Sequence, residues 1–262
     1  MTYKTFIALI FGLCMSLPSL TSAADQEKLR GKVLKFSGDV EVLDAKGETR
    51  VIKQVDEPLN EMDTVVTKKG ARIVVQFDDG ALSVLDEKSR LRVEKTSWFS
   101  YLGGKVYFTF KKVFGGEPRK IKTRAATLGI RGTTFIISEN EKGESVALKE
   151  GLLDVESNGP VFEIHKMKVM DEFAQFKQQH QQAQQDMKDE FDQYKQQTTN
   201  EFIEYRERFT LTSDRVINLS GYRVDERAMD DANKADFESF ESEADDLIKQ
   251  FRAQSKALKA NH

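Results

Sequence analysis

One glycine-bearing stretch decides the fold class of this chain: Gly129-Ile130-Arg131-Gly132-Thr133-Thr134-Phe135, read together with the upstream turn Phe77-Asp78-Asp79-Gly80. Glycines on both sides of Arg131 are typical of a strand that bends or bulges. Asp79 and Gly80 tolerate the positive φ angles that a tight hairpin turn requires. Both features predict β-structure.

The residues around this stretch alternate as strands do. Ala71, Ile73, Val75 and Phe77 place apolar side chains on one face, although Val74 interrupts the polar face. Similar short strands and glycine turns recur up to residue 164, and no stretch before residue 165 shows a long helical period. We therefore predict an all-β part over residues 24–164.

An ordered set of landmarks in this β part resembles the FecR domain, a module of bacterial envelope proteins. Gly80, Arg131, Gly132 and Thr133 belong to it, and Met62 stands where the family usually has glycine. The landmarks lie at residues 38–42, 59–67, 70–71, 75–80, 89–93, 102–106, 121–123, 130–133 and 150–151. The resemblance implies a β-solenoid-like stack of short strands, with Asp79 and these motif residues in structural roles.

The best-known FecR proteins are transmembrane regulators that control a sigma factor in iron-chelate signalling. This chain departs from them, because no cytoplasmic domain precedes its apolar segment and helices are expected after the β part. The resemblance therefore implies a secreted β module for protein–protein contact, and the transmembrane relay does not transfer.

The first 23 residues have the features of a cleavable signal peptide. Lys4 precedes an apolar run over residues 6–17, which is too short to span a bilayer, and small residues follow up to Ala23. Cleavage after Ala23 would export the protein to the periplasm, or outside the cell, and would remove Cys14, the only cysteine. The mature chain then has no disulfide or thiol chemistry.

Charge and composition change near residue 165. Residues 24–164 carry 24 Lys and Arg against 23 Asp and Glu, whereas residues 165–262 carry 15 against 20 and contain only one glycine. We predict a helical extension over residues 165–262, with two long amphipathic helices at about 166–209 and 225–260. An aromatic stripe with an eleven-residue repeat would lie on one face of the first helix: Phe173, Phe176, Phe191, Tyr194, Phe202, Tyr205 and Phe209. The two helices could form an antiparallel hairpin or a coiled-coil-like contact, or the stripe could mediate self-association.

Two surface features of the β part could bind a partner. Lys120, Lys122 and Arg124 alternate along one strand and should share a face. This face is either simply solvated or contacts an anionic partner, such as an acidic protein, an acidic glycan or lipid headgroups. Trp98 and Tyr101 either pack in the core or form a platform for sugar rings.

Catalysis is not indicated. The chain has three histidines, which are scattered, and no metal-protease, nucleophile-elbow or phosphate-loop motif, so we expect no enzyme, cofactor or metal site. A net charge of −3 in an exported chain argues against a nucleic-acid partner. The favoured function is a periplasmic interaction or scaffold protein. The alternatives are a carbohydrate- or cell-wall-binding module and a component of a sigma-factor or iron-uptake signalling system.

Overall fold

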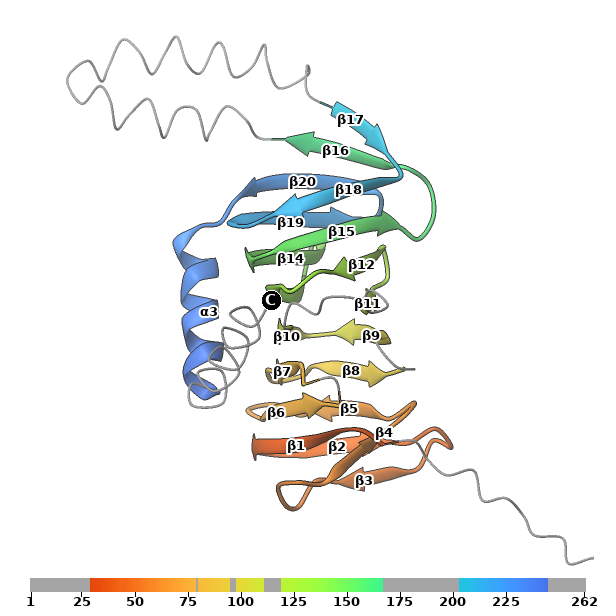
Figure 1. The fold of residues 1–262 in the computed structure, drawn as a ribbon, viewed down its shortest axis with the longest axis vertical. Coiled ribbons are helices and arrows are strands. Elements are labelled where there is room, and N and C mark those ends of the chain that lie inside the picture. Colours follow the sequence, from red (N-terminus) through yellow and green to blue (C-terminus); the bar gives the residue numbers. More distant parts are fainter. Residues whose placement is uncertain (1–28, 79, 95–97, 111–118, 167–202, 245–262) are drawn as a thin grey trace, which may run out of the picture.

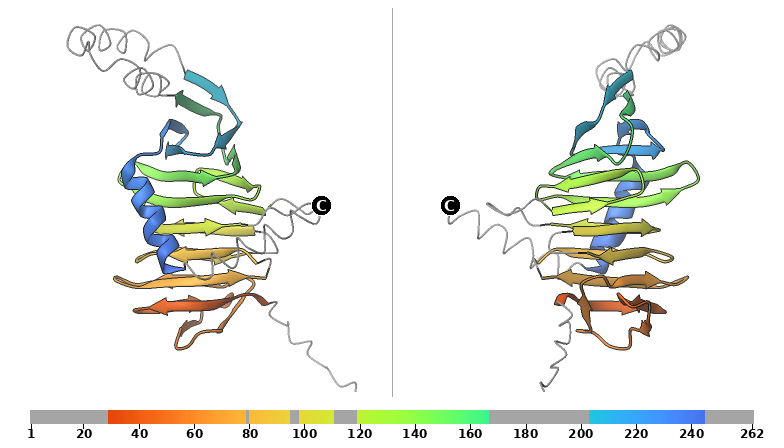
Figure 2. Two further views of the ribbon diagram at one scale, coloured as in Figure 1. Left: turned by 60° about the vertical axis from the view of Figure 1, so that its left-hand side comes forward. Right: turned by 90° about the vertical axis from the view of Figure 1, so that its right-hand side faces the viewer.

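The computed structural model describes residues 29–78, 80–94, 98–110, 119–166 and 203–244. These residues form two large β-sheets that face each other, with one helix on the outside (Figure 1). The views in Figure 2 show the strands of both sheets stacked along the long axis of the molecule. The fold of the described residues is therefore a two-layer β-sandwich with a helical cover.

The larger sheet has eleven strands among the described residues. In spatial order they are β17 (Ile203–Arg206), β16 (Phe162–Lys166), β20 (Arg223–Ala228), β19 (Arg215–Ser220), β14 (Gly143–Glu150), β13 (Thr134–Asn140), β10 (Lys105–Thr109), β7 (Leu82–Leu85), β6 (Arg72–Phe77), β1 (Leu29–Ser37) and β4 (Pro58–Asn60).

The smaller sheet has nine strands among the described residues. In spatial order they are β18 (Arg208–Thr212), β15 (Leu152–Ser157), β12 (Ala126–Ile130), β11 (Arg119–Lys122), β9 (Trp98–Gly103), β8 (Arg90–Val93), β5 (Thr64–Thr67), β2 (Val40–Leu43) and β3 (Thr49–Val51).

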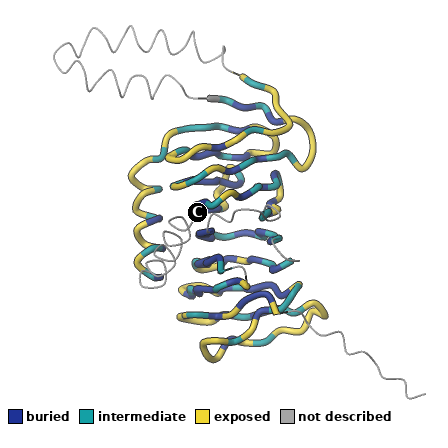
Figure 3. The backbone as a smooth tube through the Cα atoms, in the orientation of Figure 1, coloured by how far each residue is buried: buried dark blue, intermediate teal, exposed yellow. Residues whose placement is uncertain are grey.

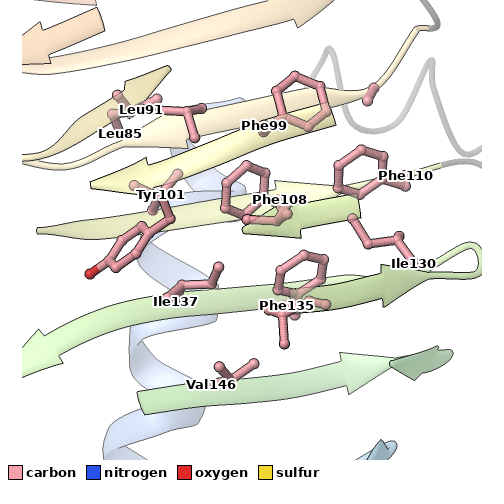
Figure 4. Close-up of a cluster of buried hydrophobic side chains, with 14 of the residues drawn as sticks. Leu85, Leu91, Phe99, Tyr101, Phe108, Phe110, Ile130, Phe135, Ile137 and Val146 are labelled. Carbon is pink, nitrogen blue, oxygen red and sulfur yellow. The ribbon is translucent and has the colours of Figure 1, made fainter. Parts of the chain in front are cut away.

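The main core fills the space between the two sheets, and Figure 3 shows the buried residues running through the whole stack. Aromatic rings occupy its centre: the ring centroids of Phe108 and Phe135 are 5.2 Å apart (Figure 4). Those of Phe77 and Phe99 are 4.5 Å apart. Strands such as β6 supply alternate residues to this core, here Ile73, Val75 and Phe77, as the period-2 pattern predicts.

A second, smaller core lies on the outer face of the eleven-stranded sheet. Helix α3 (Asp231–Glu243) crosses the strands there and buries Phe237 and Phe240 against Tyr107 and Val74. Both phenylalanines are 1% exposed, and burying such a ring contributes about 1.5–3 kcal/mol. Val74, which interrupts the polar face of its strand in the sequence, is apolar because α3 covers that face.

The predicted β-solenoid-like stack is wrong. Coils of a solenoid stack parallel strands on one another, whereas neighbouring strands here are antiparallel in every pair of the described residues except β9–β11 and β16–β20. The chain crosses between two sheets that do not close into coils. Short strands with turn residues suit both architectures, so the sequence pattern did not distinguish them.

The predicted pair of long helices is also wrong. The described residues contain one helix, α3, and both ends of the expected 166–209 helix are strands. Lys166 ends β16, and residues 203–212 form β17 and β18, which pair with β16 and β15. The expected 225–260 helix begins only at Asp231, because residues 223–228 form β20. Strands therefore lie on both sides of residue 165.

The aromatic stripe is consequently not a single helical face. Tyr205 lies in β17 and is 66% exposed, whereas Phe209 lies in β18 and packs on Phe162 with ring centroids 5.7 Å apart. Phe173, Phe176, Phe191, Tyr194 and Phe202 lie outside the described residues.

Candidate functional site

The outer faces of the two sheets differ in how they are covered. Helix α3 lies on the eleven-stranded sheet, while no described element lies on the outer face of the nine-stranded sheet (Figures 1 and 2). Strand alternation directs Leu91, Phe99 and Ile121 into the core. Their neighbours along β8, β9 and β11 therefore point outward.

Those outward neighbours form a surface that we call the cationic face: Arg90, Arg92, Trp98, Lys120 and Lys122. The strand register places Arg92 opposite Ser100, and Ser100 opposite Lys122, so the three form one row across the sheet. Lys120 pairs with Trp98 in the same register, and its Nζ lies 5.0 Å from the centroid of the indole ring.

The cations of this face lack carboxylate partners among the described residues. Arg92 Nε donates to Thr64 Oγ1 at 3.2 Å, and an Arg90 guanidinium nitrogen donates to the Leu102 carbonyl at 3.1 Å. Lys122 is exposed. The positive charge of the face therefore remains available to an external anion.

The basic residues of the opposite outer face are already neutralised. Lys35 and Arg72 pair with Glu243 of α3, Lys105 pairs with Asp236, and Lys149 pairs with Glu241. That surface is occupied by the acidic residues of this same chain. The basic residues under α3 are therefore paired within the chain, whereas those of the cationic face are open to an external partner.

A notch interrupts the nine-stranded sheet beside the cationic face. Strand β11 pairs with residues 98–100 of β9 and then ends, so residues 101–103 have no strand partner on that side within the described part of the chain. Thr123 N–H donates to the Ala126 carbonyl at 2.8 Å, towards β12. The next N–H on the β9 side, that of Arg124, would continue the ladder. It donates instead to Glu144 Oε1 at 3.0 Å.

Glu144 holds the turn that ends β11. Its side chain is buried, and it also accepts hydrogen bonds from Thr123 Oγ1 at 2.7 Å and from Ala125 N–H at 3.3 Å. Hydrogen bonds to an ionised carboxylate are among the stronger ones in proteins. The carboxylate, supplied by β14 of the other sheet, therefore fixes the shape of the notch.

The notch is a cavity of about 660 Å³, within the range of ligand pockets in proteins. Its lining is Arg92, Glu94, Trp98, Ser100, Tyr101, Leu102, Gly103, Lys122, Thr123, Arg124, Glu139 and Glu144. It opens beside the cationic face, because Arg92, Trp98 and Lys122 belong to both.

Tyr101 lies at the inner wall of the notch, and Figure 4 shows its hydroxyl pointing away from the phenylalanine rings. The hydroxyl donates to the Gly104 carbonyl at 2.7 Å. Burial raises the pKa of Tyr101 above its usual range, and the nearby carboxylates of Glu139 and Glu144 raise it further. Tyr101 is thus a buried structural group, which fits core packing and not the alternative of a sugar platform with Trp98.

The predicted basic strand is only partly regular. Lys120 and Lys122 lie in β11, on the cationic face, while Arg124 lies in the following turn and pairs with Glu139 at 3.3 Å. The sequence reasoning missed Arg92, which the alternation in β8 could have indicated, and Glu144, for which no local signal exists.

The predicted motif residues lie where the chain turns. Gly80 and Gly132 have φ of 77° and 66°, and Thr133 is buried, with its Cα only 3.0 Å from where a Cβ on Gly151 would lie. Arg131 pairs with Asp154 at 3.1 Å, whereas Asp78 of the upstream turn pairs with Arg30. Asp79 lies outside the described residues.

No group of three or more His, Cys, Asp or Glu side chains among the described residues could hold a metal ion. No helix in that part of the chain is long and apolar enough to cross a membrane.

Comparison with solved structures found matches of low similarity. A crystal structure described as a "putative anti-sigma factor from Parabacteroides distasonis ATCC 8503" is 13% identical, with a TM-score of 0.38, and the match covers 64% of this chain and 60% of that one. A second structure with the same description is 15% identical, with the same TM-score and coverage. The chain therefore spans 60% of the length of those proteins.

A structure described as "Cell surface anchoring domain" is 26% identical over 26% of this chain and 90% of its own, with a TM-score of 0.25. No curated protein matches. A family model does: the one described as FecR protein matches residues 63–154, which include the cationic face and the whole lining of the notch. Residues 63–154 thus match the FecR protein family, as the sequence landmarks predicted.

Proposed function

We propose that this chain is a non-enzymatic interaction protein of the bacterial envelope, which binds an acidic protein partner through the cationic face of its FecR domain. The observation that carries the proposal is the unequal covering of the sandwich. The chain's own acidic helix occupies one basic outer face, while the other, with Trp98, Lys120 and Lys122, has no described cover.

The composition of the cationic face suits protein recognition. Tryptophan and arginine are enriched among the residues that dominate binding energy at protein interfaces, and Trp98 and Arg92 lie on this face. Unpaired surface cations also speed the encounter with an acidic partner. The predicted signal peptide over residues 1–23 would deliver the protein to the periplasm, where such a partner would be met.

Envelope signalling of the sigma-factor type is the second candidate, and the FecR domain favours it. A protein partner fits both candidates, so the cationic face does not separate them. Transcript profiling of a deletion strain does: a signalling component changes the expression of a defined set of genes, whereas a scaffold leaves it unchanged.

Crosslinking in envelope extracts of the source bacterium tests the proposal. The mature wild-type protein should give a discrete adduct with one protein, and the double variant Lys120→Glu/Lys122→Glu should lose at least about 80% of it, because each charge reversal repels an acidic partner. The matched control, Lys46→Glu/Lys53→Glu, changes the net charge equally at exposed positions near the β3 end of the sheet and should keep the adduct.

Equal loss in both double variants would show that only net charge matters, which contradicts a defined docking face. Retention of the Lys120→Glu/Lys122→Glu protein on the partner would also contradict it. A protein that instead binds immobilised polygalacturonate through the same two lysines, and gives no protein adduct, would support the carbohydrate alternative.

A further inference from the structure

We infer that the notch receives an extended acidic segment of the partner, which adds to the open side of β9 as a short extra strand. This inference rests on the proposed function, since it specifies how the partner would meet the cationic face. Three observations carry it: a free strand side, a cavity of the right size and a net positive mouth.

The free strand side comes from the early end of β11. Phe99 lies within the stretch of β9 that pairs with β11. Because backbone direction alternates along a strand, the backbone groups of Tyr101 face the same side of β9 as those of Phe99. The backbone N–H of Arg124, which would pair with Tyr101 if β11 continued, donates to Glu144 instead. An extended peptide entering the notch could continue the ladder that β11 leaves unfinished. This mode of recognition, in which a peptide adds a strand to an exposed sheet edge, recurs in many proteins.

The cavity has room for such a segment. Residues 101–103 of β9 extend over about 10 Å at about 3.3 Å per residue. A volume of about 660 Å³ exceeds that of one side chain and accommodates a segment of three to four residues. The notch is therefore a gap in the sheet of about the length of a short strand.

The charges at the notch select an acidic segment. Its own carboxylates are engaged: Glu94 accepts from Ser100 Oγ at 2.6 Å, Glu139 pairs with Arg124, and Glu144 accepts from the turn. Lys122 and Arg92, which line the mouth, have no carboxylate partner among the described residues. The mouth therefore holds two cations, Lys122 and Arg92, beside one outward carboxylate, Glu94, while Glu139 and Glu144 are held by Arg124 and by the turn.

Strand alternation then defines the pattern of the segment. Every second side chain of an added strand points outward, towards Lys122, Arg92 and Trp98, and these positions favour Glu or Asp. The intervening side chains point inward, towards Tyr101 and Glu144, where space is limited and small polar residues fit. The expected segment alternates acidic and small residues.

Fluorescence of Trp98 provides the assay, because it is the only tryptophan in the chain. The mature full-length protein is titrated with the synthetic peptide acetyl-Ser-Glu-Ser-Glu-Ser-amide at low ionic strength, since exposed charges are screened by salt. We expect a saturable change in emission. The Kd should be at least five-fold weaker for the peptide with Gln in place of Glu, and for the Lys122→Gln protein, while Lys46→Gln protein should bind as wild type does.

A backbone-methylated version of the same peptide separates strand addition from simple charge attraction. Methylation of alternate amide nitrogens removes the donors that pair with β9 and should abolish binding, although the charge is unchanged. Equal binding of the methylated and unmethylated peptides would overturn the inference. So would the absence of any saturable response to the peptide, or a response to trigalacturonate alone.

These outcomes are distinguishable from failure of the proposed function. If the crosslinked adduct depends on Lys120 and Lys122 but the peptide does not bind, the docking face stands and strand addition is refuted. If the peptide binds as described but no adduct forms through the cationic face, the notch binds acidic strands and the proposed docking of a protein partner fails.

Discussion

Removal of the Glu144 side chain tests how the candidate site is built. In Glu144→Ala, Thr123 Oγ1 and two backbone N–H groups, those of Arg124 and Ala125, lose their acceptor, at distances of 2.7, 3.0 and 3.3 Å. A net hydrogen bond to a charged group contributes about 1.5–3 kcal/mol. The two shorter bonds, taken at the lower end because water can enter the notch, give a loss of about 3 kcal/mol.

Thermal unfolding followed by circular dichroism measures this loss. A loss of about 3 kcal/mol in a domain of this size lowers Tm by roughly 6–12 °C. The matched control is Glu141→Ala, an exposed carboxylate on the same β13–β14 hairpin, which should shift stability by less than about 0.5 kcal/mol. Glu144→Gln keeps an acceptor oxygen and should lose less than half as much as the alanine variant.

One result would refute the structural role of Glu144. If Glu144→Ala melts within about 2 °C of wild type, the carboxylate does not hold the turn, and the explanation of why β11 ends at Lys122 fails. Hydrogen exchange adds a local check, because the amides of Arg124 and Ala125 should lose protection in Glu144→Ala and keep it in Glu141→Ala.

Three further predictions concern stability. Gly132 has a φ of 66°, a region that a β-branched residue avoids, so Gly132→Val should destabilise the protein by about 1–3 kcal/mol in urea unfolding; an unchanged midpoint would contradict the conformation. Met62 has a φ of 72° and is 38% exposed, so Met62→Gly should raise Tm by roughly 2–4 °C through relief of about 1 kcal/mol of strain; a lower Tm would show that side-chain packing outweighs it. Folding raises the pKa of Tyr101, so above about pH 10 the unfolded state loses the proton that the folded state keeps, and stability falls by up to about 1.4 kcal/mol per pH unit. Tyr101→Phe should remove this part of the decline, and profiles of stability against pH that run parallel for the variant and the wild type would refute it.

Local features of the fold were predictable from the sequence because they depend on neighbouring residues. The alternation around Ile73 and Val75 predicted a strand, and the turn glycines Gly80 and Gly132 do have positive φ. The position of Met62, where the family usually has glycine, is likewise one of the few non-glycine residues with positive φ. These features need no knowledge of distant partners.

The long-range features were not predictable in this way. Tyr205 and Phe209 fit a helical stripe by spacing, yet β18 forms because Phe209 pairs with Val155, more than fifty residues earlier in the chain. Tertiary pairing overrides local periodicity in such short segments. Direction of strand pairing is equally invisible in a period-2 pattern, so the pattern could not correct the solenoid-like stack that the family resemblance implied.

The candidate site also combines features that the local sequence predicts with features that depend on distant residues. Lys120 and Lys122 share a face because they are two residues apart on one strand, and that follows from the sequence alone. Glu144 belongs to the notch because β14 of the opposite sheet brings it beneath the turn at Arg124. No spacing in the sequence links these two residues.

Site-specific photocrosslinking in living cells tests the central claim most directly. A photoreactive residue is placed at Thr127, which lies opposite Lys122 on the open outer face, and separately at Ala235, which is exposed on α3 over the opposite face. The account predicts a discrete protein adduct from position 127 that disappears when Lys120→Glu/Lys122→Glu is added, and no such adduct from position 235. A discrete adduct from position 235 with none from position 127 would contradict it.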